Sequence, residues 1–394
     1  MVLMGMEKSW WTGLWFLAQG IQKVLLMQEA LKGSGDGWFF STFFAIMPSK
    51  PLDQSAMKNS TSRIAYATLR GVFKSVLESR GFDAEKASLC AGLFADASLD
   101  GVASHGLNRF PEFVRLVDAG IVDPRAEPSL DFALPIFERW NGNLGAGPLN
   151  AHFSMGRAIA MAKEQGMGAV ALRRTNHWKR GGNFGWQAGR EGCVAICFTN
   201  TLPNMPAWGA KEPRLGNNPL VIAIPRDPEP IVLDMAMTQF AYGKMQAYLR
   251  EGRQMPFAAG FTAGGEVTQD PKEVLASGLA MPMGMWKGAG LAMMLDLIAS
   301  LLSGGLATMD IGKLEEEHAI SQFFLCLYPP KLGLNQETIN DRLMVWVEDL
   351  KSADTFSGES SQYPGEQSLK NRADNQRLGV PVDREIWKRV LGMI

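Results

Sequence analysis

A histidine and an arginine stand four residues apart in the segment SHGLNRF, residues 104–110. In a helical turn this spacing places both side chains, His105 and Arg109, on one face. An imidazole titrates near neutral pH and can protonate a carbonyl oxygen, while a guanidinium can hold a carboxylate through paired hydrogen bonds. Together the two residues suit the reduction of a 2-keto acid. The alternative is a capped surface turn with a solvated arginine.

A second polar cluster is TNHWKRGGNFGW, residues 175–186, which follows a predicted strand. Proteins of the α/β class place ligand-binding loops at such positions. Its two tryptophans, His177 and two basic residues are suited to line a pocket for a polyol or a sugar acid. The alternative is a strand-to-helix loop whose tryptophans belong to the core.

Two glycine-rich loops, residues 142–147 and 284–290, are candidates for phosphate binding. The first predicted strand is not followed by a GxGxxG dinucleotide fingerprint, and a Walker loop is absent. The second loop opens a long apolar helix, where backbone N–H groups and the helix dipole can meet a phosphate and Lys287 adds charge. Glycines in front of a buried helix can equally serve close packing.

Composition excludes several classes of function. The chain has 394 residues with 39 Lys and Arg against 40 Asp and Glu, so no basic surplus drives binding to nucleic acid or an anionic membrane. The four cysteines are scattered, and the four histidines show no zinc-type spacing, so we expect no metal site and buried rather than metal-binding cysteines. We find no run of 18 apolar residues and therefore expect no membrane span.

Hydrophobic periodicity predicts alternating helices and strands from Ile64 onward. Helices are expected at residues 65–80, 83–98, 111–120, 151–165, 183–190, 288–302 and 335–352. Short apolar strands are expected at residues 168–172, 193–198, 220–224, 231–234 and 323–327. Apolar strands between helices indicate an α/β sheet covered on both faces.

The domain plan has four parts. Residues 1–61 form an extension rich in Met and bulky aromatics; we expect it to be dispensable, either unstructured or the product of a misassigned start. Residues 62–135 form a helical N-terminal part that carries His105, residues 136–330 a nicotinamide-binding α/β domain, and residues 331–394 a helical part that returns to the N-terminal part. Because no signal-type cleavage motif follows the first apolar stretch, we expect a cytoplasmic protein.

Six segments occur in an order and spacing that resemble the type 2 malate/L-lactate dehydrogenase family. They are DGVASHGLNRFPEFV (100–114), TNHWKRGGNFGWQA (175–188), WGAKEPRLGNNPLVIAIP (208–225), LDMAMTQFAYGK (233–244), PMGMWKGAGLAMMLDLIASLLSGG (282–305) and YPGEQ (363–367). The resemblance covers roughly residues 63–394. The NHWxRGG stretch points to a branch that reduces keto sugar acids.

The resemblance implies a non-Rossmann mixed-sheet α/β fold with a helical N-terminal part, a homodimer and a nicotinamide cofactor. His105 becomes the proton donor, and Arg109 and His177 become substrate-binding residues. The implied cofactor-binding residues are Pro230, Ile231, Val232, Leu233, Asp234, Met235, Ala236, Trp286, Lys287, Gly365, Glu366 and Gln367. An acid near the ribose favours NAD, with Asp234 and Glu366 as candidates, although NADP remains open.

Other activities of the family stay open at this point. Malate, L-lactate, sulfolactate and cyclic imino acids are alternative substrates, and a catalytically inactive small-molecule binding protein is an alternative of another class. Against the inactive protein, His105, Arg109 and Lys287 are all present.

Overall fold

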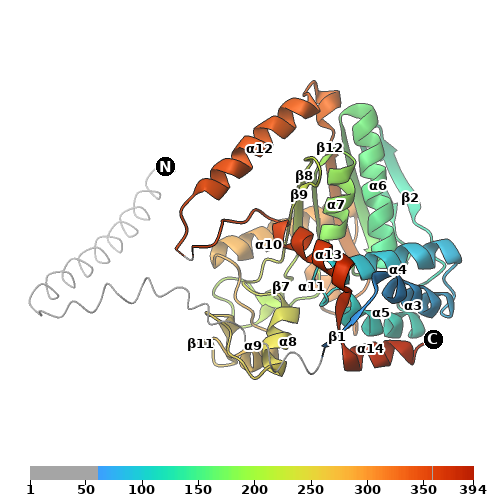
Figure 1. Ribbon diagram of the computed structural model, residues 1–394. Helices are drawn as coiled ribbons and strands as arrows, with labels where there is room; N and C mark the ends of the chain where they lie inside the picture. The colour runs from blue at the N-terminus through green and yellow to red at the C-terminus, as the bar shows by residue number, and fades with distance from the viewer. Residues whose placement is uncertain (1–60, 357) are drawn as a thin grey trace, which may run out of the picture. The chain divides into compact units, whose positions relative to one another are not determined.

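The computed structural model describes residues 61–356 and 358–394, which belong to one unit of the chain, Ser55–Ile394 (Figure 1). The predicted extension therefore lies outside the described residues apart from Thr61, which begins strand β1 (Thr61–Ile64). This strand pairs antiparallel with β13 (Val380–Asp383), close to the other end of the chain.

A helical bundle follows β1. It consists of α3 (Tyr66–Glu78), α4 (Ala84–Leu99) and α5 (Phe110–Asp118), joined by the last helix, α14 (Arg384–Leu391). The rings of Phe73 and Phe110 stack with centroids 4.1 Å apart, and Phe94 meets Phe110 edge-on at 5.1 Å. Asp83 caps α4 by accepting the Lys86 N–H. The predicted helical N-terminal part is thus confirmed.

A seven-stranded sheet forms the centre of the fold. Its strands, from one edge to the other, are β2 (Ser129–Leu134), β3 (Phe137–Asn141), β4 (Met167–Thr175), β12 (Ile320–Leu327), β5 (Val194–Thr199), β8 (Leu220–Ile224) and β9 (Ile231–Met235). Only β3 and β4 pair in parallel, and the other neighbours are antiparallel. The sheet is therefore mixed, which agrees with the predicted non-Rossmann fold.

Helices cover both faces of this sheet, as the apolar strands predicted. On one face α6 (Gly147–Gln165) and α7 (Gly182–Arg190) pack against Ala195 and Cys197 of β5. On the other face α10 (Trp286–Ser303) packs near Ile196 and Phe198 of the same strand. The alternation along β5 is the two-residue period of a strand whose two sides are both buried.

Smaller elements complete the described chain. They are η2 (Leu107–Arg109), β6 (Met205–Pro206), β7 (Pro213–Leu215), α8 (Tyr242–Arg250), β10 (Gly260–Phe261), β11 (Val267–Thr268), α9 (Pro271–Ser277), α11 (Thr308–Ile311), η3 (Pro329–Leu332), α12 (Gln336–Ser352) and α13 (Glu366–Leu378). Helices α8 and α9 share a small core of their own around Met245 and Val274. The hydrophobic pattern predicted α12 but neither α8 nor α13.

Among the described residues, one helix is long and apolar enough to cross a membrane by length and composition. It is α10, with a mean hydropathy of 1.2 over 18 residues, of which 44% is buried within the protein. Lys287 and Asp296 interrupt this helix, so it is not an unbroken run of 18 apolar residues. A single helix of this kind is weak evidence for a span, because core helices pass the same test.

Candidate active site

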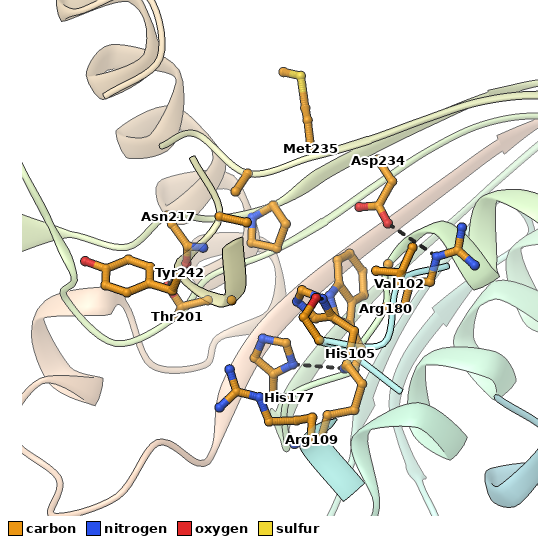
Figure 2. A pocket seen from close by; sticks show the side chains of 18 of the residues that line it. Val102, His105, Arg109, His177, Arg180, Thr201, Asn217, Asp234, Met235 and Tyr242 are labelled. Carbon is orange, nitrogen blue, oxygen red and sulfur yellow. Dashed lines mark hydrogen bonds and ion pairs between the residues drawn. The ribbon is translucent and has the colours of Figure 1, made fainter. Parts of the chain in front are cut away.

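A cavity of about 850 Å³ opens between the helical bundle and the edge of the sheet that ends in β9 (Figure 2). Its walls come from the segment between α4 and α5, the loop between β4 and α7, strand β9, the start of α8 and the turn before α13. Figure 2 shows His105, His177 and Arg109 at one end of the cavity, with Asp234 and Met235 on a separate wall. Segments far apart in the sequence therefore meet in one concave site, the usual form of a small-molecule site.

His105 and Arg109 both line the cavity, but they do not stand on one helical face. His105 lies in a series of tight turns after α4, in which its N–H donates to the Val102 carbonyl at 3.0 Å. Arg109 ends the 3₁₀ turn η2, directly before α5. The predicted helical i, i+4 relation is wrong. The two side chains reach the same cavity because the turn at Gly106, whose Cβ would collide with Ser98, folds the segment tightly against α4.

The surroundings of His105 favour its neutral form. Burial is the main cause that lowers the pKa of His105 to about 4. The Asp234 carboxylate opposes this shift, whereas three nearby cations strengthen it: Arg109, Lys179 and Arg180. Ser104 Oγ lies 3.1 Å from His105 Nδ1 and can fix the orientation of the ring. The expected titration near the usual imidazole range therefore moves to acidic pH in the free protein.

The loop after β4 supplies both core and cavity residues. Trp178 is 1% exposed and packs with Phe184 and Phe324, so the core alternative was right for its ring, although the same residue also borders the cavity. His177 is half-buried and lines the cavity, and its Nδ1 accepts the Lys179 N–H at 2.9 Å. Burial lowers the pKa of His177 well below its usual value, so its Nε2 carries the proton and can donate to a ligand.

A buried ion-pair network lies below the cavity, and sequence reasoning missed it. Asp100, at the end of α4, pairs with Arg180 and accepts a hydrogen bond from Arg372 Nε at 2.6 Å. Asp234 Oδ2 accepts the Gly182 N–H at 2.8 Å and lies 4.0 Å from Arg180 Nε. The network joins α4, α7, β9 and α13 around the site. A usable signal was the Asp-Gly pair that ends an otherwise apolar helix, matched by an arginine in the polar loop.

The predicted cofactor segment at β9 lies along the cavity. Val232, Leu233, Asp234, Met235 and Ala236 line it, as does Gly365. Gly365 has φ 89° and begins α13 without a side-chain cap, and a Cβ there would approach the Val232 carbonyl oxygen to 2.9 Å. An uncapped helix N-terminus beside an edge strand fits an anionic group such as a cofactor phosphate.

Six predicted cofactor residues do not line this cavity: Pro230, Ile231, Trp286, Lys287, Glu366 and Gln367. Glu366 is buried and forms ion pairs with Lys351 at 2.7 Å and Lys370 at 3.0 Å. Trp286 is 63% exposed at the start of α10, and Lys287 is exposed beside it. A Cβ at Gly288 would collide with the Met283 backbone, which supports the close-packing interpretation of that glycine.

Uncharged polar residues that the sequence analysis did not single out as site residues line another part of the cavity. They are Thr201, Asn204, Asn217, Tyr242 and Gln246. Thr201 Oγ1 lies 3.1 Å from Asn217 Oδ1, and the Tyr242 hydroxyl donates to the Asn204 carbonyl. These groups come from loops whose approach depends on the sheet, so no local spacing could reveal them.

The model of the malate/L-lactate dehydrogenase family matches residues 64–391. The chain belongs to this family. It is 39% identical over 331 residues to a 2,3-diketo-L-gulonate reductase of Escherichia coli O127:H6, covering 83% of this chain and 99% of that protein. The family resemblance drawn from the six segments is thereby confirmed.

Solved structures of the family share the fold. A malate dehydrogenase from Entamoeba histolytica superposes with a TM-score of 0.81 at 25% identity, covering 84% of this chain and 97% of that one. A sulfolactate dehydrogenase from Methanocaldococcus jannaschii reaches 0.76 at 26% identity, covering 84% and 96%. The chain is thus a dehydrogenase of the malate/L-lactate family, which acts on a CH–OH group with a nicotinamide cofactor.

Proposed function

We propose that the protein uses NADH to reduce a 2-keto sugar acid, 2,3-diketo-L-gulonate, to 3-dehydro-L-gulonate. The observation that carries the proposal is the meeting of His105, Arg109 and the β9 segment in one cavity. The substrate class rests on the relative of that name at 39% identity and on the polar lining of the cavity.

In this proposal Arg109 holds the substrate carboxylate. Its guanidinium lines the cavity close enough to His105 for its charge to lower the pKa of that imidazole. A planar guanidinium binds both carboxylate oxygens at once and so orients the acid as well as attracting it. His177 Nε2–H is a second donor at this end of the cavity.

His105 is the proposed proton donor to the C2 oxygen. When bound, the nicotinamide supplies a hydride to C2, and the carbonyl becomes a hydroxyl as the imidazolium loses its proton. A positioned acid of this kind contributes roughly 10²–10⁴ in rate. A bound carboxylate beside Arg109 raises the fraction of His105 that is protonated, because it offsets the cations that surround the ring.

Backbone groups of β9 and the uncapped start of α13 are the proposed holders of the cofactor. We propose a preference for NAD because Asp234 lies on this wall, and a carboxylate accepts the ribose 2′-hydroxyl but repels a 2′-phosphate. Asp234→Ser should lower the ratio of kcat/KM for NADH over kcat/KM for NADPH. An unchanged ratio would assign the preference to another residue.

The proposal includes a homodimer in the cytoplasm. The face of α10 turned away from the sheet exposes a row of large apolar side chains: Leu291, Met294, Leu297, Ile298 and Leu301. A patch of this kind marks an association surface, and a second copy is the simplest partner. Sedimentation of the wild type and of Leu301→Asp tests the dimer.

The proposed cytoplasmic location rests on the cysteines. All four are free and buried, which agrees with a reducing compartment.

A cofactor-by-substrate matrix tests the function. The purified protein is assayed for loss of NADH or NADPH absorbance with 2,3-diketo-L-gulonate, oxaloacetate, pyruvate, sulfopyruvate and a cyclic imino acid. We expect the highest kcat/KM with NADH and the diketo acid. A higher value with another acid would reassign the substrate, and no turnover with any acid would favour an inactive binding protein.

A further inference from the structure

Lys179 is a buried cation that the mechanism above leaves without a task. The residue is 9% exposed and lines the cavity together with Arg109 and His177. Within the described part of the chain its ammonium group makes no hydrogen bond or ion pair, and it lies over the Phe113 ring, 5.4 Å from Nζ to the centroid. Burying an ammonium group without a partner is costly, so a partner from outside the chain is expected.

The backbone holds Lys179 in this position at a cost. Its φ is 66°, in the left-handed region that residues with a side chain rarely adopt. The Lys179 N–H is fixed by the hydrogen bond to His177 Nδ1. Such strain persists where the surrounding structure enforces it, and it often marks a functional position. The direction in which the Cα–Cβ bond leaves the backbone is therefore set before any ligand arrives.

The groups facing Lys179 leave its charge largely uncompensated. Burial, followed by the charge of Arg109, lowers the pKa of Lys179 to about 8, while the carboxyls of Glu317 and Glu112 and the thiol of Cys90 act in the opposite direction. Glu112 is already bound by Arg115 at 2.7 Å, and burial raises the pKa of Glu317. His105 and His177 are held neutral by their lowered pKa values.

We propose that Lys179 binds the oxygen on C3 of the substrate and so selects 2-keto acids that carry an oxo or hydroxyl group there. The inference rests on the proposed function and deepens it. The planar fork of Arg109 suits the two oxygens of the carboxylate, whereas the compact ammonium of Lys179 suits a single oxygen. C3 is bonded to the reacting carbon, so its oxygen lies beside the C2 carbonyl that His105 protonates.

The test compares two sugar keto acids that differ only at C3: 2,3-diketo-L-gulonate and the corresponding 3-deoxy-2-keto acid. Lys179→Met keeps an unbranched side chain that is one atom shorter and the same backbone strain, but it removes the charge and the donors. The control is Lys74→Met on α3, where the lysine is 41% exposed and 3.5 Å from Glu78. Thermal melting checks that each variant is folded.

We expect K179M to lower the ratio of kcat/KM for the 3-oxo acid over the 3-deoxy acid by roughly 10- to 100-fold, the value of a hydrogen bond to a charged group. Most of the change should be in KM, and K179R should recover part of it. The control should keep the wild-type ratio. An equal loss on both acids would overturn the inference and assign Lys179 to the carboxylate or to the fold. A loss confined to oxaloacetate, whose second charge is on C4, would also overturn it.

A pH series separates binding from a structural role. In the wild type the ratio should fall as pH rises through about 8, because the ammonium form of Lys179 is lost there. The ratio cancels the titration of His105, which acts on both acids. K179M and K179R should show no such step, since neither side chain titrates in this range. A step that persists in K179M would overturn the inference, whereas a wild type that reduces neither acid would instead defeat the proposed function.

Discussion

Two Trp-Lys pairs, each in a glycine-rich segment in front of a helix, have opposite environments in this protein. Trp178 and Lys179 precede α7 and are 1% and 9% exposed, whereas Trp286 is 63% exposed and Lys287 beside it is also exposed at the start of α10. The first pair lines the cavity and the second does not. A basic residue beside glycines is thus a ligand candidate only after the fold has enclosed it.

The difference comes from what lies over each helix start. The start of α7 is covered by the helical bundle, since the Asn183 side chain donates to the Leu93 carbonyl of α4 at 3.0 Å. Gly185 lets α7 approach the sheet, because a Cβ there would lie 2.8 Å from Val221 and Val232. In the described chain nothing comparable covers Trp286. The buried segment should therefore control catalysis, and the exposed one should have small effects.

The largest effect is expected from His105 in the enclosed region. His105→Ala should lower kcat for reduction by about 100-fold or more, because the proton donor is lost, while NADH binding persists. His105→Asn should not restore the rate, since an amide can hydrogen-bond the carbonyl but does not release a proton. Steady-state kinetics and an NADH fluorescence titration measure the two quantities. Near-normal turnover in His105→Ala would transfer the role to His177.

Arg109→Lys should have the next largest effect. The charge remains but the planar fork is lost, so KM for the keto acid should rise about 10-fold, more than kcat falls. A matched change at the surface, Arg70→Lys on α3, removes a fork that only reaches Ser88 and should leave both constants unchanged. If Arg109→Lys changed kcat alone, Arg109 would act on the transition state and not as the carboxylate anchor.

The pH dependence of the reaction tests the electrostatic environment of His105. Reduction needs protonated His105, whose pKa is lowered to about 4, so kcat/KM for reduction should fall with rising pH above that value. Oxidation of the 2-hydroxy acid needs the neutral ring, so it should stay level at neutral pH and decline only below about 4. Lys179→Met removes one cation and should move both limbs to higher pH. Limbs that stayed fixed would separate Lys179 from the electrostatics of His105.

The smallest effect is expected at Lys287. If this exposed lysine contacts a cofactor phosphate, Lys287→Ala should raise KM for NADH by at most about 5-fold, the value of a solvent-screened ion pair. The keto-acid constant should not move. A loss as large as that of Arg109→Lys would mean that α10 is enclosed in the working enzyme, for example by a second copy. An unchanged NADH constant would remove Lys287 from the cofactor site.

Local sequence patterns predicted the helices and strands well where interactions between residues close in sequence determine the structure. Helices α3, α4 and α12 and strands β8 and β9 lie within two residues of their expected bounds, because apolar periodicity and caps such as Asp83 are short-range signals. Helix α13 was missed because it is strongly polar, with only Glu366 and Asn375 buried. Its place beside β9 depends on contacts that no local pattern encodes.

In the candidate site, too, local motifs predicted some features, and others depend on residues that are distant in sequence. Sequence motifs alone were enough to identify the family and the candidate pair His105 and Arg109, since those motifs are local and specific. They did not determine that a run of turns, and not a helix, brings the pair together, nor that Asp100 and Arg180 form a buried ion pair under the cavity.

Which charged side chains are enclosed depends on the packing of the folded chain. Lys179 and Lys287 have the same ionisable group and the same neighbour in the chain, yet one is buried beside Arg109 and the other lies in solvent. Burial and neighbouring charge set the pKa of a group and the energy of its contacts, and both come from residues distant in sequence. Residue type therefore determined what chemistry was available, and the packing of the bundle against the sheet determined where it operates.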